Sequence, residues 1–188
     1  MFIVKKLSDN SKEFLDTFYN IVDQLNESVD AVEPTKSISE TYINQLVPLL
    51  QAGVKMNDNI LKYTTNVDIE NFAKNMNFDL NNEIEKLNQM KESCSCTCNN
   101  ERDLKLYNRR FKELFNNTIQ RLNNTPATNN VDAFYLTTMI IHHEGTIATA
   151  KNALSYTLCP ELKELLMDIV DEQNLQISTM KGLLKNII

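Results

Sequence analysis

Apolar side chains that recur every three or four positions are the feature that most limits what this chain can fold into. The pattern continues from Phe14 to Leu184 with short polar interruptions, and no segment alternates between apolar and polar residues as a strand would. Only three Gly and four Pro occur among 188 residues, so we expect few turns and long helices. The sequence therefore predicts an all-α fold, an antiparallel helical bundle.

The two halves of the sequence resemble each other. Residues 47–54 align without a gap on residues 140–147, and residues 60–64 align on residues 153–157. Each half shows three helical patterns separated by short turns, as expected for two copies of one supersecondary unit. We therefore predict a bundle built from two three-helix repeats.

The predicted repeats are joined by a short segment rich in cysteine. The N-terminal repeat spans residues 1–91 and is degenerate, the Cys-rich linker spans residues 92–100 and is expected not to be helical, and the C-terminal repeat spans residues 101–188. Both histidines of the chain fall in the C-terminal repeat.

These histidines, His142 and His143, are adjacent, and the spacing of apolar residues places His143 inside the apolar seam of its helix. The aligned positions of the N-terminal repeat hold Leu49 and Leu50. An imidazole buried where a leucine fits costs free energy unless its nitrogens find partners. The pair is therefore either a set of metal ligands or a core group hydrogen-bonded to Glu172, and the sequence leaves both alternatives open.

Further metal-binding side chains are expected near the histidines. If the last two helices form a hairpin, equal helical rise brings Glu172 to within about one turn of the pair. Met139 lies one turn before His143, and Met180 falls near the level of Met139. We predict a metal site made of His142, His143, Glu172, Met139 and Met180, although both methionines also fit a role in core packing. Imidazole with thioether favours copper, whereas imidazole with carboxylate also suits Zn or Fe.

Cys94, Cys96 and Cys98 form a second candidate metal site in the linker. Alternating cysteines can surround a soft ion such as Cu(I) or Zn with three thiolates. A tetrahedral zinc site would need a fourth ligand, from Cys159 or from a second chain, so a homo-oligomer stays open. The alternatives for the linker are redox chemistry and a flexible segment with exposed thiols. Cys159, beside a turn, is expected to be structural.

Charge and hydropathy exclude several classes of partner. The net charge is −6 and no basic stripe occurs, which argues against nucleic acid as a partner. No run of about 18 apolar residues is present, so no membrane span is expected and a membrane is not predicted as a partner. The apolar run before Lys5 is too short for a secretory signal. These features predict a cytoplasmic protein whose thiols are free or bind metal.

Two motifs of the C-terminal repeat resemble those of a known family, the domain of unknown function 305 (DUF305), a ferritin-like helical family. The motifs are Met139-x-x-His142-His143-Glu144-Gly145-x-Ile147 and Asp171-Glu172-Gln173-x-x-x-Ile177-x-x-Met180. The resemblance covers residues 131–184 well and residues 38–91 weakly.

The resemblance implies a ferritin-like bundle, which in this family often contains two tandem copies. Some members are associated with copper or metal handling. By resemblance, the functional positions would be His142, His143, Met139, Glu172 and Met180. The first copy lacks the histidines, so at most one such site is expected.

We therefore expect a metal-binding protein, with copper favoured over Zn or Fe, that stores, buffers or senses the ion. The alternative is a structural or protein-interaction helical module without bound metal. An enzyme is not favoured. Ferritin-like di-iron centres use Glu-x-x-His pairs, which the sequence lacks, and no nucleophile stands at a recognisable spacing from the histidines.

Overall fold

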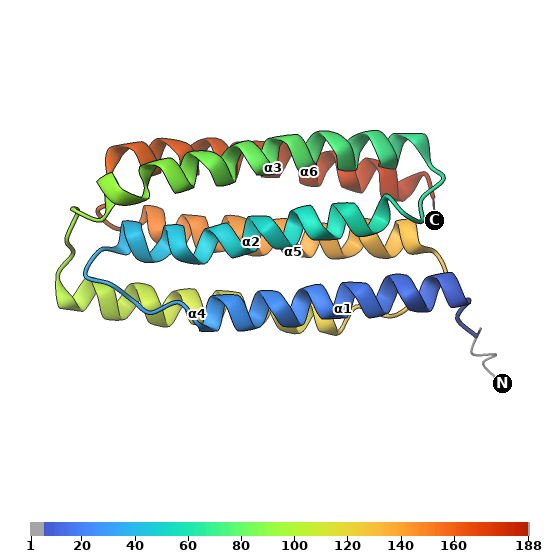
Figure 1. Cartoon of the computed structure of the whole chain (residues 1–188), viewed down its shortest axis with the longest axis horizontal. Coiled ribbons are helices and arrows are strands. Elements are labelled where there is room, and N and C mark those ends of the chain that lie inside the picture. Colours follow the sequence, from blue (N-terminus) through green and yellow to red (C-terminus); the bar gives the residue numbers. More distant parts are fainter. Residues whose placement is uncertain (1–5, 188) are drawn as a thin grey trace.

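The computed structural model describes residues 6–187 and consists of six long α-helices that run along the long axis of the molecule (Figure 1). The helices are α1 (Asp9–Asp30), α2 (Ile38–Ile60), α3 (Val67–Cys94), α4 (Glu101–Asn123), α5 (Val131–Leu154) and α6 (Pro160–Lys185). No strand occurs in residues 6–187, and the predicted all-α bundle is confirmed. Residues 1–5, where we expect no secretory signal, and residue 188 lie outside the described part of the chain.

The six helices form three layers of two (Figure 1). Helices α2 and α5 make the middle layer, α3 and α6 cover one side of it, and α1 and α4 cover the other. Consecutive helices pack together within each half, and the halves meet where α2 contacts α5, α3 contacts α6 and α1 contacts α4. Two three-helix units placed side by side would give this arrangement, but the repeat itself stays a prediction.

Five of the six helices begin with a polar side chain that accepts a hydrogen bond from a free backbone N–H of the first turn. These N-caps are Ser8, Ser37, Asn66, Asn100 and Asn130. Helix α6 differs, because its N-cap is Cys159, which makes no side-chain capping bond, and Pro160 follows. Pro is well suited to a first helical position, where the N–H that it lacks would have no partner within the helix.

The middle layer is buried on both sides, so its central side chains are sealed from solvent. Side chains with no exposed surface include Tyr42, Ile43, Leu46 and Leu50 of α2 and Leu136, Met139, His142 and His143 of α5. None of the helices in residues 6–187 is long and apolar enough to cross a membrane.

The linker was predicted incorrectly at its start. Helix α3 continues to Cys94, so the non-helical connection covers residues 95–100 instead of residues 92–100. The last turn of α3 stays helical because Cys94 is fully buried and anchored in the core. Helix α4 begins at Glu101, as expected.

Gly145 allows the close approach of α4 and α5. A Cβ built on Gly145 would lie 2.9 Å from the Cβ of Thr118 on α4, which is closer than side chains pack. By contrast, a Cβ on Gly182 of α6 would meet nothing within 4 Å.

We expect Gly145→Ala to lower the free energy of unfolding by about 1–3 kcal/mol, because the added methyl group forces α4 and α5 apart. Gly182→Ala is the matched control and should raise it by roughly 0.5–1 kcal/mol, since alanine favours the helix. Urea denaturation of both variants measures the two changes. Equal effects of the two substitutions would contradict the close packing at Gly145.

Candidate metal centre

The two histidines lie at the middle of α5 with their rings side by side in the core. Neither ring has any exposed surface, the ring centroids are 5.8 Å apart, and the ring planes form an angle of 61°. The predicted burial of His143 is therefore observed, and His142 is equally buried.

Each histidine uses Nε2 to bind an oxygen on a neighbouring helix. His142 Nε2 lies 3.0 Å from the carbonyl oxygen of Leu49 on α2, the residue at the position that aligns with His142 itself. His143 Nε2 lies 2.8 Å from Oε1 of Gln176 on α6, and Gln176 Nε2 donates to Glu172 Oε1 at 3.1 Å. Carbonyl and amide oxygens only accept hydrogen bonds, so both rings carry their proton on Nε2. Each Nδ1 consequently has a free lone pair.

Neither Nδ1 has a hydrogen-bond partner within residues 6–187. The same holds for Oε2 of Glu83 on α3 and for both amide atoms of Gln173 on α6. A Cβ on Gly53 would touch both Leu80 Cδ1, at 3.1 Å, and His142 Cε1, at 3.4 Å. Leu80 and His142 therefore lie close to the same glycine, and Glu83 follows Leu80 by about one turn of α3. On the other side, Gln173 precedes Gln176, the partner of His143, by about one turn of α6. Buried polar atoms without partners are uncommon in folded proteins and call for an explanation.

Burial also sets the protonation of these groups. It lowers the pKa of His142 to about 4, against the smaller opposing effect of the bond to Leu49. Burial, and then the neighbouring His142, lower the pKa of His143 to about 3, against smaller opposing effects of Gln176 and of the backbone of Met139. Both rings are therefore neutral near pH 7, which is the form of imidazole that binds metal ions.

Glu83 and Glu172 form an acidic pair between α3 and α6. Burial, and then the nearby carboxylates of Glu172 and Asp79, raise the pKa of Glu83 to about 8, against a smaller opposing effect of Lys86. Burial and Asp79 likewise raise the pKa of Glu172. Gln176 links Glu172 to His143 through one hydrogen bond to each of them.

The five predicted ligands do not all meet in this conformation. Met139 and Met180 are fully buried in the core, as either role for them requires. Within residues 6–187, one group of three His, Cys, Asp or Glu residues has its donor atoms within 4.8 Å of one another, and that group does not contain His142, His143 or Glu172. The structure thus presents a histidine pair in place of a completed site, with Glu172 in an outer position.

Sequence analysis missed Gln176 and Glu83. Gln176 follows Glu172 by four residues and therefore shares its helix face, which was an available signal. Glu83 occupies a position in the apolar seam of α3 between Leu80 and Leu87. A carboxylate in such a seam is unusual enough to be noticed from sequence alone.

The predicted three-cysteine site needs a correction. Cys94 Sγ is bonded to Cys159 Sγ across a Cα–Cα distance of 5.4 Å, whereas Cys96 and Cys98 are free and exposed. Cys94 belongs to the buried last turn of α3 and faces the core, so it does not share an ion with the two loop cysteines while the disulfide is intact. Cys159 is the disulfide partner of Cys94 and not a fourth ligand beside Cys96 and Cys98. Metal binding by Cys96 and Cys98 stays a prediction.

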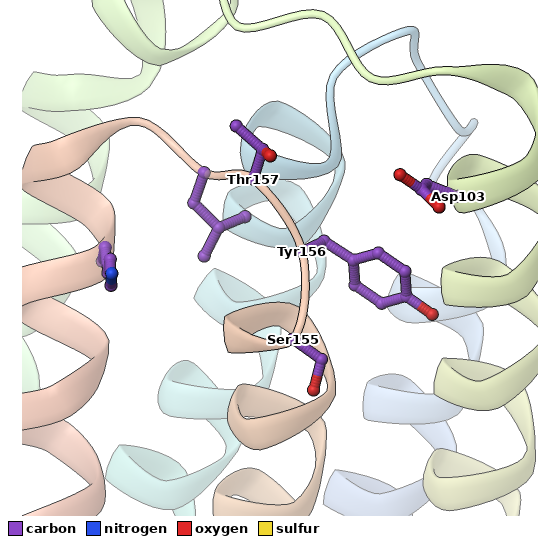
Figure 2. Close-up of a pocket in the computed structure, with 6 residues that line it drawn as sticks. Asp103, Ser155, Tyr156 and Thr157 are labelled. Carbon is purple, nitrogen blue, oxygen red and sulfur yellow. The ribbon is translucent and has the colours of Figure 1, made fainter.

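A surface pocket of about 470 Å³ lies at the turn between α5 and α6. Figure 2 shows Ser155, Tyr156 and Thr157 along this turn, with the ring of Tyr156 directed to the side where Asp103 of α4 lies. None of the predicted ligands lines this pocket.

We expect the histidines to make the metal-free protein sensitive to acid. Their folded pKa values lie below the unfolded value near 6.5, so the unfolded chain binds more protons and stability falls as the pH drops from 6.5 towards 4. Relative to His142→Leu/His143→Leu, the wild type should lose roughly 2–4 kcal/mol between pH 6.5 and pH 5. Denaturant titrations at several pH values test this, and the variant controls for Glu83, whose raised pKa acts in the opposite direction. A difference in stability that does not change with pH would show that the rings are not held neutral.

Comparison with known proteins places the C-terminal half in a family. The chain is similar to two solved structures, "CopM in the Cu(II)-bound form" and "CopM in the Ag-bound form (by soaking)", each with a TM-score of 0.59 and 19% sequence identity. The first match covers 80% of this chain and 97% of the other, and the second covers 81% and 98%. This likeness concerns the fold. No curated protein matches the chain significantly. The model of the family described as "Domain of unknown function (DUF305)" matches residues 112–184, from α4 through α5 into α6, and the predicted resemblance to this family is confirmed for these residues.

Proposed function

We propose that this protein binds a copper ion at the His142–His143 pair. The observation that carries the proposal is that two buried, neutral imidazoles each direct Nε2–H to an oxygen acceptor and keep Nδ1 free. Histidines that ligate metals characteristically donate their other ring N–H to a carbonyl, carboxylate or water, which fixes the ring and its tautomer. Leu49 and Gln176 provide such acceptors here.

The surrounding donors favour copper over Zn or Fe. The two Nδ1 atoms would be direct ligands, and the buried thioethers of Met139 and Met180 are the candidates to complete the set. A mixture of imidazole and thioether is typical of copper sites, whereas Zn and non-haem Fe sites typically combine imidazole with thiolate or carboxylate. In this proposal Glu172 supports the site through Gln176 and does not bind the ion directly. The Cu(II) and Ag named with the CopM structures agree in kind with this donor set.

Complete burial of the pair determines how an ion would reach it. With no exposed surface on either ring, binding requires a local opening of the layers that cover α5. Slow uptake and slow release follow, which suits storage or buffering better than rapid transfer.

A structural role is the second candidate function, and one observation favours it. Each ring already has one satisfied hydrogen bond to a neighbouring helix, and these bonds join α5 to α2 and to α6. In that case the histidines would stabilise the bundle and bind no ion.

Copper binding is tested by His142→Leu/His143→Leu, which copies Leu49 and Leu50 of the first half. We expect wild-type protein dialysed against Cu(II) and then buffer to retain about one ion per chain, and the folded variant to retain none. Elemental analysis gives the ratio and circular dichroism verifies the fold. A Cys96→Ser/Cys98→Ser variant is the control for binding by exposed thiols. Equal retention in wild type and the histidine variant would contradict the proposal.

The supporting role of Gln176 gives a separate prediction. Gln176→Leu removes the acceptor for His143 Nε2 and should weaken copper binding by about 10–100-fold, the usual cost of losing such a partner. Gln89→Leu, at an exposed position of α3, is the control and should leave affinity unchanged. Competition with a chromophoric chelator measures both affinities. Should Gln176→Leu bind copper as wild type does, His143 would not be a ligand of the proposed kind.

A further inference from the structure

A second group of metal-binding side chains lies where the end of α3 meets the start of α6. Here the disulfide joins Cys94, which has no exposed surface, to Cys159, which is 3% exposed. Glu161, in the first turn of α6, completes a group in which one carboxylate oxygen and both sulfurs lie within 4.8 Å of one another. Glu161 takes part in none of the ion pairs found within residues 6–187, and its side chain is exposed.

Two buried serines hold the backbones of the cysteines independently of the disulfide. Ser37 Oγ donates to the carbonyl oxygen of Cys94 at 3.2 Å, and the amide of Cys159 donates to Ser39 Oγ at 2.9 Å. Both serines lie at the start of α2 and are at most 1% exposed. Neither bond involves a sulfur atom, so both can form in the reduced protein and would keep the backbones of the two cysteines close together.

Asn99 strengthens the same junction. Its backbone N–H donates to the carbonyl oxygen of Lys36 at 3.0 Å. Its side-chain Nδ2 donates to the carbonyl oxygen of Thr157 at 2.9 Å, and its Oδ1 accepts from the backbone N–H of Ile38 at 2.9 Å. One side chain thus ties the loop after Cys94 to the turn before Cys159 and to the start of α2. The junction is held by hydrogen bonds from three segments.

Cys159 stands at the start of a helix. It is the N-cap of α6, at the positive end of the helix dipole, although its side chain makes no capping bond and its sulfur is joined to Cys94. Helix N-termini lower the pKa of a thiol and stabilise the anionic form that binds metal ions.

We propose that reduction of the Cys94–Cys159 disulfide creates a site for a thiophilic divalent cation of the Zn²⁺ class, held by the two thiolates and the Glu161 carboxylate. A dithiol reductant supplies two electrons and two protons, the S–S bond is cleaved to two thiols, and the reductant leaves as a disulfide. Binding of the cation then releases the two thiol protons. Two sulfurs and one oxygen leave one tetrahedral position open, and the oxygen donor suits Zn²⁺ better than Cu(I).

Solvent reaches the bundle close to these residues. The surface pocket at the α5–α6 turn is lined by Leu158, which precedes Cys159, and by Lys163, two residues after Glu161. Glu161 itself is exposed. An ion can therefore reach the Glu161 carboxylate directly, whereas the sulfur atoms of Cys94 and Cys159 are buried and a reductant reaches them only when the start of α6 opens locally. The site is separate from the histidine pair and does not depend on copper binding there.

The test uses full-length protein carrying Cys96→Ser/Cys98→Ser, so that only the two disulfide cysteines remain. One portion is reduced with a phosphine, which is oxidised to its oxide with oxygen from water, and the other portion is left oxidised. We expect the reduced protein to take up one Co²⁺ with a thiolate-to-cobalt charge-transfer band that Zn²⁺ abolishes by displacement. The oxidised protein should show no such band.

Two variants identify the ligands. Glu161→Ala leaves the disulfide intact and should weaken Zn²⁺ binding to the reduced protein by about tenfold or more, equivalent to one lost ligand interaction. Glu164→Ala, an exposed neighbour on the same helix, should bind as the parent does. Absence of the charge-transfer band in reduced protein, whether or not circular dichroism shows intact helices, would overturn the proposal. Equal affinities of the Glu161 and Glu164 variants would overturn the three-donor site.

Discussion

Burial of the middle layer is the constraint on which the rest of this structure depends. Because α2 and α5 are covered on both sides, polar atoms near their centres have no access to water and must find partners within the protein. The imidazoles of α5 meet this demand only in part: the N–H of each ring is bonded, and the lone pair of each ring is not. A bound ion would give each unpaired Nδ1 lone pair a partner.

Periodicity in the sequence was enough to predict the bundle, the approximate helix ranges and the burial of His143. It identifies the face of each helix that is buried, but not the helix that lies opposite. The link from His143 to Glu172 was therefore expected to be direct, although Gln176 lies between them. Glu83 was missed for the same reason, since its proximity to Glu172 depends on the lateral packing of α3 against α6.

The cysteines show where spacing along the chain fails as a guide. Cys94, Cys96 and Cys98 are close in sequence, but helix α3 ends between the first and the second, which places Cys94 in the core and the others at the surface. The partner of Cys94 is 65 residues away, at the start of a different helix. Disulfides are typical of oxidising compartments, so this bond does not support the cytoplasmic location predicted from the same cysteines.

The contact between His142 and Leu49 has a consequence for sequence variation. The acceptor is a main-chain carbonyl, so the first half supports the histidine without needing any particular side chain at position 49. A substitution of Leu49 leaves this hydrogen bond intact as long as the backbone of α2 keeps its position. Because Leu49 is itself buried, packing still restricts its side chain, but this contact alone creates no covariation between positions 49 and 142. The position of His142 therefore depends in part on the backbone of α2, and a comparison of side-chain identities among related chains does not reveal this dependence.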